Sequence, residues 1–212
     1  MKRRSEMRME EPLNIIITGV GGQGNVIASQ ILGSAAVEDG FCVSIGETYG
    51  AAQRGGAVMS HVRLFKQNEY GSLIPQGGAH IILGFEPIES LRTLGSFGNK
   101  KTKVIVNPRP IYPIDVLAGM AKYPAVDDIL RVIKELVSSI HVVEATELAK
   151  EAGDSIMQNV VMVGCLAGSG FTPVKIETLK EVINMIFAEK RPEANLKAFE
   201  LGVKAIRETK PL

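Results

Sequence analysis

Short apolar runs rich in β-branched residues alternate with helical patterns along most of the chain. The apolar runs predict buried strands at residues 15–18, 42–45, 80–83, 104–106 and 141–143. Between several of them lie helical patterns, at residues 26–38, 87–94 and 126–138. This alternation is typical of βαβ crossovers, which build a mostly parallel sheet with helices on both faces.

The segment at residues 57–64 departs from this scheme, because its polarity alternates more than that of the other runs. A turn-like stretch follows it at residues 68–72. Alternating polarity indicates a strand with one face toward solvent, so we expect an edge strand or a hairpin here.

From about Ala145 onward the pattern is helical, with helices expected at residues 147–152, 155–167, 175–187 and 192–207. The sequence therefore predicts an α/β fold of three layers. It is Rossmann-like, with a mostly parallel sheet, helices on both faces and a C-terminal helical segment packed on the sheet. We expect residues 1–12 to form a flexible N-terminal tail and residues 13–208 to form a single domain.

Composition narrows the function classes. The 24 Lys and Arg residues balance the 23 Asp and Glu residues to a net charge of +1, which gives no electrostatic basis for nucleic acid or an anionic membrane as a partner.

No apolar run approaches the roughly 20 residues of a membrane helix, and no signal-peptide core is visible, so we expect a cytoplasmic protein. The two cysteines, Cys42 and Cys165, are too few to hold an iron–sulfur cluster or a structural zinc ion, so no metal site is predicted.

A glycine-rich turn connects the first predicted strand to the first predicted helix. Gly19, Gly21 and Gly24 satisfy the pattern G-x-G-x-x-G, and Gly22 and Gln23 make the run more distinctive. At such a turn backbone N–H groups and the helix dipole favour an anion, so the turn could hold a phosphate, pyrophosphate or carboxylate. The alternative is structural: the same glycines could simply allow a tight turn into a packed helix.

A second glycine-rich loop follows the second predicted strand. Glu47 falls near the position at which a dinucleotide fold holds a ribose, which would suggest an NAD-binding protein. The residues of interest after it are Gly50, Gln53, Arg54, Gly55 and Gly56. The Arg54 guanidinium could grip a phosphate or carboxylate with two N–H groups, or it could be a solvated surface cation. If the two strands are neighbours in a parallel sheet, both loops lie at its carboxyl edge, where ligands of this architecture bind.

Other polar residues say less about the function of the chain. Asn107 ends a predicted strand before Pro108 and could form a turn or contact a ligand. Asn159 and Gln158 lie in a predicted helix, as contacts to a partner or as solvated positions. The three histidines show no metal-ligand spacing, and the pattern G-x-S-x-G of serine hydrolases does not occur.

Taken together, the two loops at this spacing, followed by Ser60-His61-Val62-Arg63, resemble the gamma-type subunit of 2-oxoacid:ferredoxin oxidoreductases. The Gln53-Arg54-Gly55-Gly56 run looks most like that of the small (beta) subunit of indolepyruvate-type enzymes, and Asn107 and the Asn159–Gly164 segment also match. The similarity extends over nearly the whole chain.

The resemblance implies a complex that oxidatively decarboxylates an aryl pyruvate with coenzyme A, giving an acyl-CoA, carbon dioxide and reduced ferredoxin. It implies that this chain binds no cofactor alone, and that a larger partner subunit carries thiamine diphosphate and iron–sulfur clusters. Coenzyme A would be the co-substrate and ferredoxin the electron acceptor, and the isolated chain could form a homodimer. The backbone from Gly19 to Gly24 would act as an anion cradle and Arg54 as a charge clamp.

Two other functions stay open from the sequence. One is a stand-alone NAD(P)-dependent oxidoreductase that uses the same glycine turn, although no Tyr-x-x-x-Lys pair follows it. The other is a non-catalytic module for ligand binding or assembly. The interpretation as an oxidoreductase subunit requires a partner subunit, and this requirement distinguishes it from both of these functions.

Overall fold

A single mixed sheet forms the centre of the computed structural model, which describes residues 11–48 and 56–212. The strands stand in the order β2-β3-β1-β4-β5-β6. They are β1 (Leu13–Val20), β2 (Cys42–Thr48), β3 (Ala57–Phe65), β4 (Ile81–Gly84), β5 (Lys103–Val106) and β6 (Ser139–Val142). Pairing is parallel from β1 through β4 and β5 to β6, whereas β3 is antiparallel to both of its neighbours.

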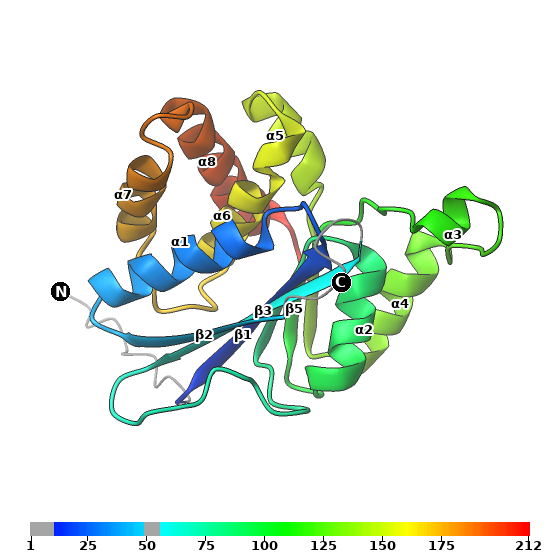
Figure 1. Ribbon diagram of the computed structural model, residues 1–212, viewed down its shortest axis with the longest axis horizontal. Coiled ribbons are helices and arrows are strands. Elements are labelled where there is room, and N and C mark those ends of the chain that lie inside the picture. The colour runs from blue at the N-terminus through cyan, green and yellow to red at the C-terminus, as the bar shows by residue number, and fades with distance from the viewer. Residues whose placement is uncertain (1–10, 49–55) are drawn as a thin grey trace.

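Helices cover both faces of this sheet (Figure 1). One face carries α1 (Asn25–Glu38), α5 (Ala145–Ala152), the 3-10 helix η1 (Ser155–Met157), α6 (Gln158–Gly168), α7 (Ile176–Ile186) and α8 (Pro192–Glu208). The other carries α2 (Pro87–Phe97) and α4 (Val126–Leu136), and a short helix, α3 (Ile114–Leu117), lies apart from both layers. The predicted three-layer α/β fold and its C-terminal helical layer are confirmed.

The central strand β1 divides the hydrophobic core into two parts. Its eight residues are all buried, and successive side chains of a strand point to opposite faces of a sheet. Ile15 and Ile17 therefore pack with α1, α6 and α8, whereas Ile16 packs with residues of α2 and α4. A strand covered on both faces reads as a continuous apolar run, which is why this element is visible in the sequence.

The prediction for residues 57–64 is wrong in one respect. β3 is not at the edge of the sheet, because it lies between β1 and β2. A hairpin is present, since β3 pairs antiparallel with the preceding strand β2. It is not made through the turn-like stretch at residues 68–72, because the following strand β4 pairs with β1 and β5. The edge strand is β2, of which Cys42 and Ile45 are exposed, although its apolar run had indicated a buried strand.

The polar residues of β3 explain the error. Ser60, His61 and Arg63 are buried, and each has a partner there. Arg63 Nε donates to Asn14 Oδ1 at 3.0 Å, and its Nη1 donates to the carbonyl of Gly71 at 2.7 Å. Alternating polarity therefore arises from buried polar groups that are hydrogen-bonded, and not from a solvated face.

The position of β3 also changes how the two glycine-rich loops come together. The first loop follows β1 and the second follows β2, and these strands are not neighbours. Because β3 is antiparallel to both, β1 and β2 run in the same direction, and their carboxyl ends lie at the same edge. The expected shared edge is confirmed, although the reason is different.

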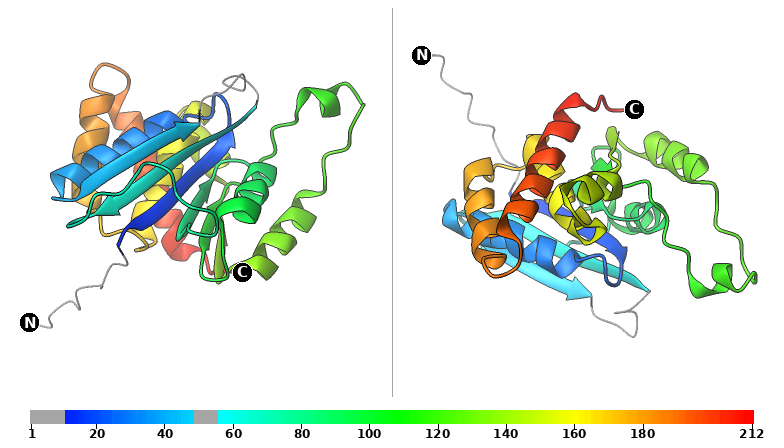
Figure 2. Two further views of the ribbon diagram at one scale, coloured as in Figure 1. Left: turned by 60° about the horizontal axis from the view of Figure 1, so that its bottom comes forward. Right: turned by 90° about the horizontal axis from the view of Figure 1, so that it is seen from above.

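Between β5 and α4 the chain leaves the body of the molecule. Residues 108–125, which we call the arm, project outward and carry α3 near their far end (Figure 2). The sequence pattern did not predict this feature. Within the described parts of the chain, no helix combines the length and apolar character that crossing a bilayer requires. Of the expected N-terminal tail, only Glu11 and Pro12 belong to the described residues.

Candidate functional site

The glycine-rich turn has a backbone that only glycine adopts readily. Gly22 and Gly24 have φ angles of +102° and +85°, in the left-handed region that side chains disfavour. A Cβ atom on Gly24 would also lie 2.4 Å from Asn159 Nδ2. The turn is therefore specified both by its own conformation and by the packing of α6 behind it.

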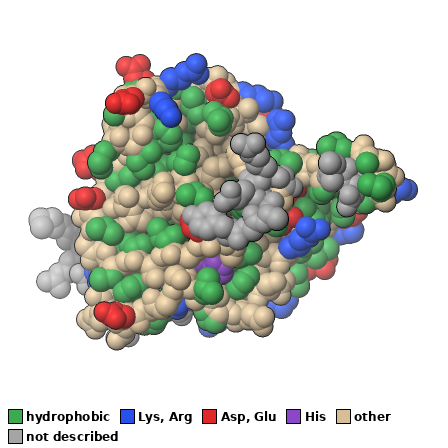
Figure 3. All heavy atoms as spheres, in the orientation of Figure 1, with side chains coloured by type: hydrophobic (Ala, Val, Ile, Leu, Met, Phe, Trp, Pro, Cys, Tyr) green, Lys and Arg blue, Asp and Glu red, His purple; other side chains and the backbone are tan. Residues whose placement is uncertain are grey.

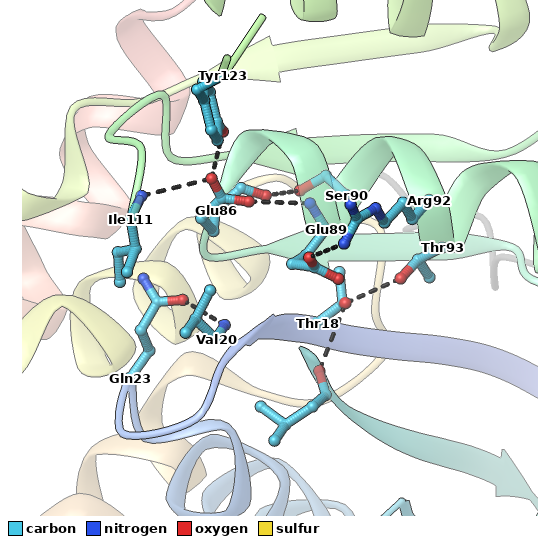
Figure 4. Close-up of polar contacts among 11 residues, drawn as sticks. Thr18, Val20, Gln23, Glu86, Glu89, Ser90, Arg92, Thr93, Ile111 and Tyr123 are labelled. Atoms are coloured by element: carbon cyan, nitrogen blue, oxygen red, sulfur yellow. Dashed lines mark hydrogen bonds and ion pairs between the residues drawn. The ribbon is translucent and has the colours of Figure 1, made fainter. Parts of the chain in front are cut away.

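Gln23 holds this turn in place from inside the protein. Its side chain is 5% exposed. The amide N–H of Val20 donates to Gln23 Oε1 at 2.7 Å (Figure 4). Gln23 Nε2 donates to the carbonyl of Phe85 at 2.9 Å. Both ends of the side-chain amide are thereby engaged with protein atoms, so Gln23 shapes the turn. The N–H groups of Gly21 and Gln23 also donate within the protein, to the carbonyls of Gly56 and Val20.

A hollow of about 320 Å³ lies against the turn. It is lined by Gly21, Gly22, Gly24, Asn25, Val26, Ile27, Glu47, Thr48 and Val58. The N–H groups of Asn25, Val26 and Ile27, in the first turn of α1, meet no acceptor in the described residues, as the geometry of a helix N-terminus requires. This end of α1 favours an anion through its dipole.

Asn25 is a residue of this hollow that sequence reasoning missed. It is 4% exposed, and neither its Oδ1 nor its Nδ2 has a hydrogen-bond partner within the described residues. A buried amide without partners costs free energy, on the order of 1–3 kcal/mol. Its position beside the free N–H groups means that a ligand could supply the missing partner. The sequence signal was an Asn at the first helical position after the glycines.

Glu47 lines the same hollow, but its carboxylate is held by the protein. Ser29 of α1 donates to Oε1 at 2.7 Å, and Ser60 of β3 donates to Oε2 at 2.5 Å. The residue predicted to read a ribose thus connects α1, β2 and β3. Each of its two oxygens already accepts a hydrogen bond from the protein itself.

The second glycine-rich loop falls mostly outside the described residues, which include neither Gly50 nor Gln53, Arg54 and Gly55. Gly56, at its far end, is described. Its carbonyl accepts a hydrogen bond of 2.8 Å from the N–H of Gly21. The last residue of the second loop is therefore joined directly to the first loop.

Asn107 lies behind the turn and does not line the hollow. It is fully buried at the end of β5. Its Nδ2 donates to Thr146 Oγ1 at 3.0 Å and to Gln158 Oε1 at 3.2 Å, and a longer contact of 3.3 Å reaches the Phe85 carbonyl. Since that carbonyl also accepts from Gln23, Asn107 belongs to the buried network that supports the turn.

Asn159 supports the turn from α6. It is 5% exposed, so the interpretation as a solvated position is wrong. Its Nδ2 lies 3.5 Å from the carbonyl of Gly24. Asn159 also lines a larger hollow of about 700 Å³ between α1, η1 and the junction of α7 and α8. Ile27 contributes to both hollows, which places them side by side.

Glu86, next to Phe85, is a second residue that the sequence did not indicate. It is fully buried. Its carboxylate accepts hydrogen bonds from the Tyr123 hydroxyl, from the N–H of Glu89 at 2.9 Å and from the N–H of Ile111 at 3.4 Å (Figure 4). Burial raises the pKa of Glu86 above its ordinary value, although these hydrogen bonds oppose the change.

This raised pKa predicts a pH-dependent stability. A carboxyl group whose pKa is higher in the folded state stabilises the fold below its ordinary pKa of 4.5, and this contribution is lost as pH rises through the raised pKa. We therefore expect the unfolding free energy of the wild type to fall, relative to that of Glu86→Gln, as pH rises from 4.5. A tenfold difference in proton affinity between the folded and unfolded states corresponds to about 1.4 kcal/mol of this free energy.

Urea unfolding of both proteins between about pH 4 and 8 measures this difference. Glu181→Gln, at an exposed position of α7, is the matched control and should keep the wild-type dependence on pH. If the unfolding free energies of Glu86→Gln and of the wild type change in parallel over this whole pH range, the pKa of Glu86 is not raised in the folded state.

Comparison with known proteins assigns the chain to a family. A family model described as pyruvate ferredoxin/flavodoxin oxidoreductase matches residues 14–205. The chain belongs to this family. It is 43% identical over 196 residues to the indolepyruvate oxidoreductase subunit IorB of Pyrococcus horikoshii, an alignment that covers 92% of this chain and 96% of that protein. The resemblance inferred from the two loops is therefore confirmed.

Two solved structures share the fold of this chain. The 2-oxoglutarate:ferredoxin oxidoreductase of Magnetococcus marinus, solved with 2-oxoglutarate, coenzyme A and succinyl-CoA bound, matches with a TM-score of 0.74 at 22% identity, over 96% of this chain and 32% of that chain. A keto/oxoacid ferredoxin oxidoreductase gamma subunit from Geobacter sulfurreducens matches with a TM-score of 0.66 at 22% identity, over 92% of this chain and 98% of that chain. In the second protein the fold stands as a separate subunit, whereas in the first it is about a third of a longer chain.

Proposed function

We propose that this chain is the small subunit of an indolepyruvate-type 2-oxoacid:ferredoxin oxidoreductase and works only with a larger subunit. The observation that carries the proposal is the 43% identity to the Pyrococcus horikoshii IorB subunit over 92% of the chain. The reaction is the oxidative decarboxylation of an aryl pyruvate with coenzyme A, which yields an acyl-CoA, carbon dioxide and reduced ferredoxin.

The cofactors of this reaction fit the larger subunit and not this chain. The sequence has two cysteines, whereas a cubane or two-iron cluster is held by about four cysteine or histidine ligands. Across the described residues, no three His, Cys, Asp or Glu side chains are grouped as a metal site. We therefore assign the iron–sulfur clusters to the partner, and the family resemblance implies the same place for thiamine diphosphate.

The role of this chain is to hold the anionic part of coenzyme A or of the oxoacid. The start of α1 lines the hollow beside the glycine turn, together with Asn25, whose buried amide has no hydrogen-bond partner among the described residues. Preorganised donors of this kind bind an anion without rearrangement, because Gln23 and Asn159 already fix the turn. Arg54, in the loop whose end is joined to Gly21, adds a charged clamp to this set.

Kinetics of the assembled complex test this division of roles. In complex purified anaerobically, Arg54→Ala is expected to raise the KM for coenzyme A or the oxoacid about 10- to 100-fold, the effect of losing a charge-assisted hydrogen bond of about 1.5–3 kcal/mol. The matched control is Arg131→Ala on α4, which removes a guanidinium that is 68% exposed and pairs with Asp128.

Each contrary outcome points to a different function. Unchanged kinetics of an assembled Arg54→Ala complex would refute the clamp. A colourless chain that purifies alone, binds NADH and reduces a carbonyl would support a stand-alone NAD(P)-dependent oxidoreductase. A chain that binds the larger subunit but adds nothing to turnover would be an assembly module.

A further inference from the structure

The arm (residues 108–125) exposes two large apolar side chains near its far end. Leu117 is 72% exposed and Met120 is 74% exposed. These two residues we call the arm tip, and hydrophobic side chains are visible over the lobe that the arm forms in Figure 3. Exposed large apolar groups that gather on a projection mark an interaction site more often than a free surface.

Hydrogen bonds fix the base of the arm and leave its far end free of the body. At the base, the buried carboxylate of Glu86 accepts from the Tyr123 hydroxyl and from the N–H of Ile111. Tyr112 packs edge-on against Tyr123, with 5.3 Å between the ring centres. The outgoing and returning segments of the arm are thus anchored on one residue of the core (Figure 4).

The far end is closed by local hydrogen bonds. The N–H groups of Val116 and Leu117 donate to the carbonyl of Pro113 at 3.0 and 3.1 Å, and the N–H of Gly119 donates to the carbonyl of Val116 at 3.1 Å. The arm therefore presents an ordered apolar tip on an anchored base. When an ordered tip binds a partner, it loses less conformational entropy than a disordered segment would lose.

The arm leaves the body at the edge of the sheet that carries the glycine turn. β1, β4 and β5 are parallel, so the segment after β5 starts at the same edge as the turn after β1. The connection is direct, because the Phe85 carbonyl accepts from Gln23 of the turn while the next residue, Glu86, anchors the arm. A protein that covers the glycine turn therefore lies within reach of the arm.

We propose that the arm tip inserts into an apolar hollow on the larger subunit and fixes that subunit over the glycine turn. This inference rests on the proposed function. A stable interface between two proteins buries about 800 Å² per partner, more than the two tip side chains provide, so the tip belongs to a larger contact that includes the neighbouring edge. The arm leaves the body at the sheet edge that carries the glycine turn, and the proposed function places the larger subunit over that turn, so the larger subunit, and not a second copy, is its neighbour.

Substitutions at the tip test the proposal. The variant Leu117→Asp with Met120→Asp should bind the purified larger subunit at least about 100-fold more weakly than the wild type. Its thermal unfolding midpoint should match that of the wild type, because these side chains bury little in the isolated chain. The matched control, Val37→Asp with Met185→Asp, changes two residues that are 57% and 66% exposed on α1 and α7, away from the arm (Figure 1), and should bind like the wild type.

The outcomes separate this inference from the function on which it rests. If the wild-type chain does not bind the larger subunit, the proposed function fails. If the wild type and the tip variant bind it equally, the function stands and the arm is not its contact. A tip variant that only converts a dimer of the isolated chain into a monomer would overturn the proposal in favour of a second copy, and a loss of thermal stability would show that the tip packs on its own body.

Discussion

Gly202→Ala should lower the free energy of unfolding by about 3 kcal/mol or more, at the upper end of what overpacking costs in a core. α6 and α8 cross in direct backbone contact. A Cβ atom on Gly202 would lie 2.0 Å from the carbonyl oxygen of Val161, and one on Gly164 would lie 2.1 Å from that of Phe199. The atoms in the way are backbone, so no rotamer change relieves the clash and the helices must separate.

Gly95→Ala is the matched control for this substitution. Gly95 also lies inside a helix, α2, but it is exposed, and a Cβ atom there meets nothing within 4 Å. The same change should stabilise this site by roughly 0.5–1 kcal/mol, since alanine favours a helix over glycine. Urea unfolding of both variants gives the comparison. A Gly202→Ala protein as stable as the wild type would mean that α6 and α8 are not in contact at this glycine.

The parts of the fold that the sequence predicts are those determined by local patterns. The apolar run of β1 and the helical pattern of α1 follow from which faces of these elements are buried. Between them, φ angles of +102° and +85° at Gly22 and Gly24 require glycine. The family resemblance follows from the same residues, because their backbone requirements restrict what can replace them.

The parts that the sequence does not predict depend on partners distant along the chain. β3 read as an edge strand because Ser60 and Arg63 are polar, and only the structure shows that they bond to Glu47 and Asn14. From the sequence, Asn107 could form a turn or contact a ligand. In the structure it is buried behind the glycine turn, where it donates to Thr146 and Gln158. No local pattern reports such pairings.

The arm and its anchor were missed for the same reason. Residues 108–125 contain four prolines and few charges, which reads as an irregular connection. Nothing in that stretch indicates that Tyr123 and Ile111 return to the carboxylate of Glu86. Glutamate is not among the residues preferred at an N-cap, although Glu86 occupies that position in α2 and its Oε2 accepts from the N–H of Glu89.

The second large effect is expected at Gly24, because the proposed function depends on the backbone of the glycine turn. Alanine at this position has to adopt a φ of +85°, and its Cβ would lie 2.4 Å from Asn159 Nδ2. The start of α1 would shift, and with it the N–H groups of its first turn. A misplacement of about 1 Å costs on the order of 100-fold in rate.

Gly40→Ala provides a control with the same backbone penalty. Gly40 has a φ of +82°, and a Cβ atom there meets nothing within 4 Å. It follows α1 at the end opposite to the turn. Both substitutions carry the same penalty for a left-handed alanine, roughly 1–2 kcal/mol, and Gly24→Ala adds the contact with Asn159. The two variants are therefore compared in fully assembled complexes, where a difference in kinetics reports on the site.

The most direct measurement is therefore the coenzyme A-dependent reduction of ferredoxin by the anaerobically purified complex carrying either variant, at saturating and limiting coenzyme A and oxoacid. We predict that Gly24→Ala lowers kcat/KM for coenzyme A or for the oxoacid about 100-fold, while Gly40→Ala leaves both near the wild-type values. Equal kinetics of the two variants in fully assembled complexes would contradict the assignment of the glycine turn as the anion-binding element of this subunit.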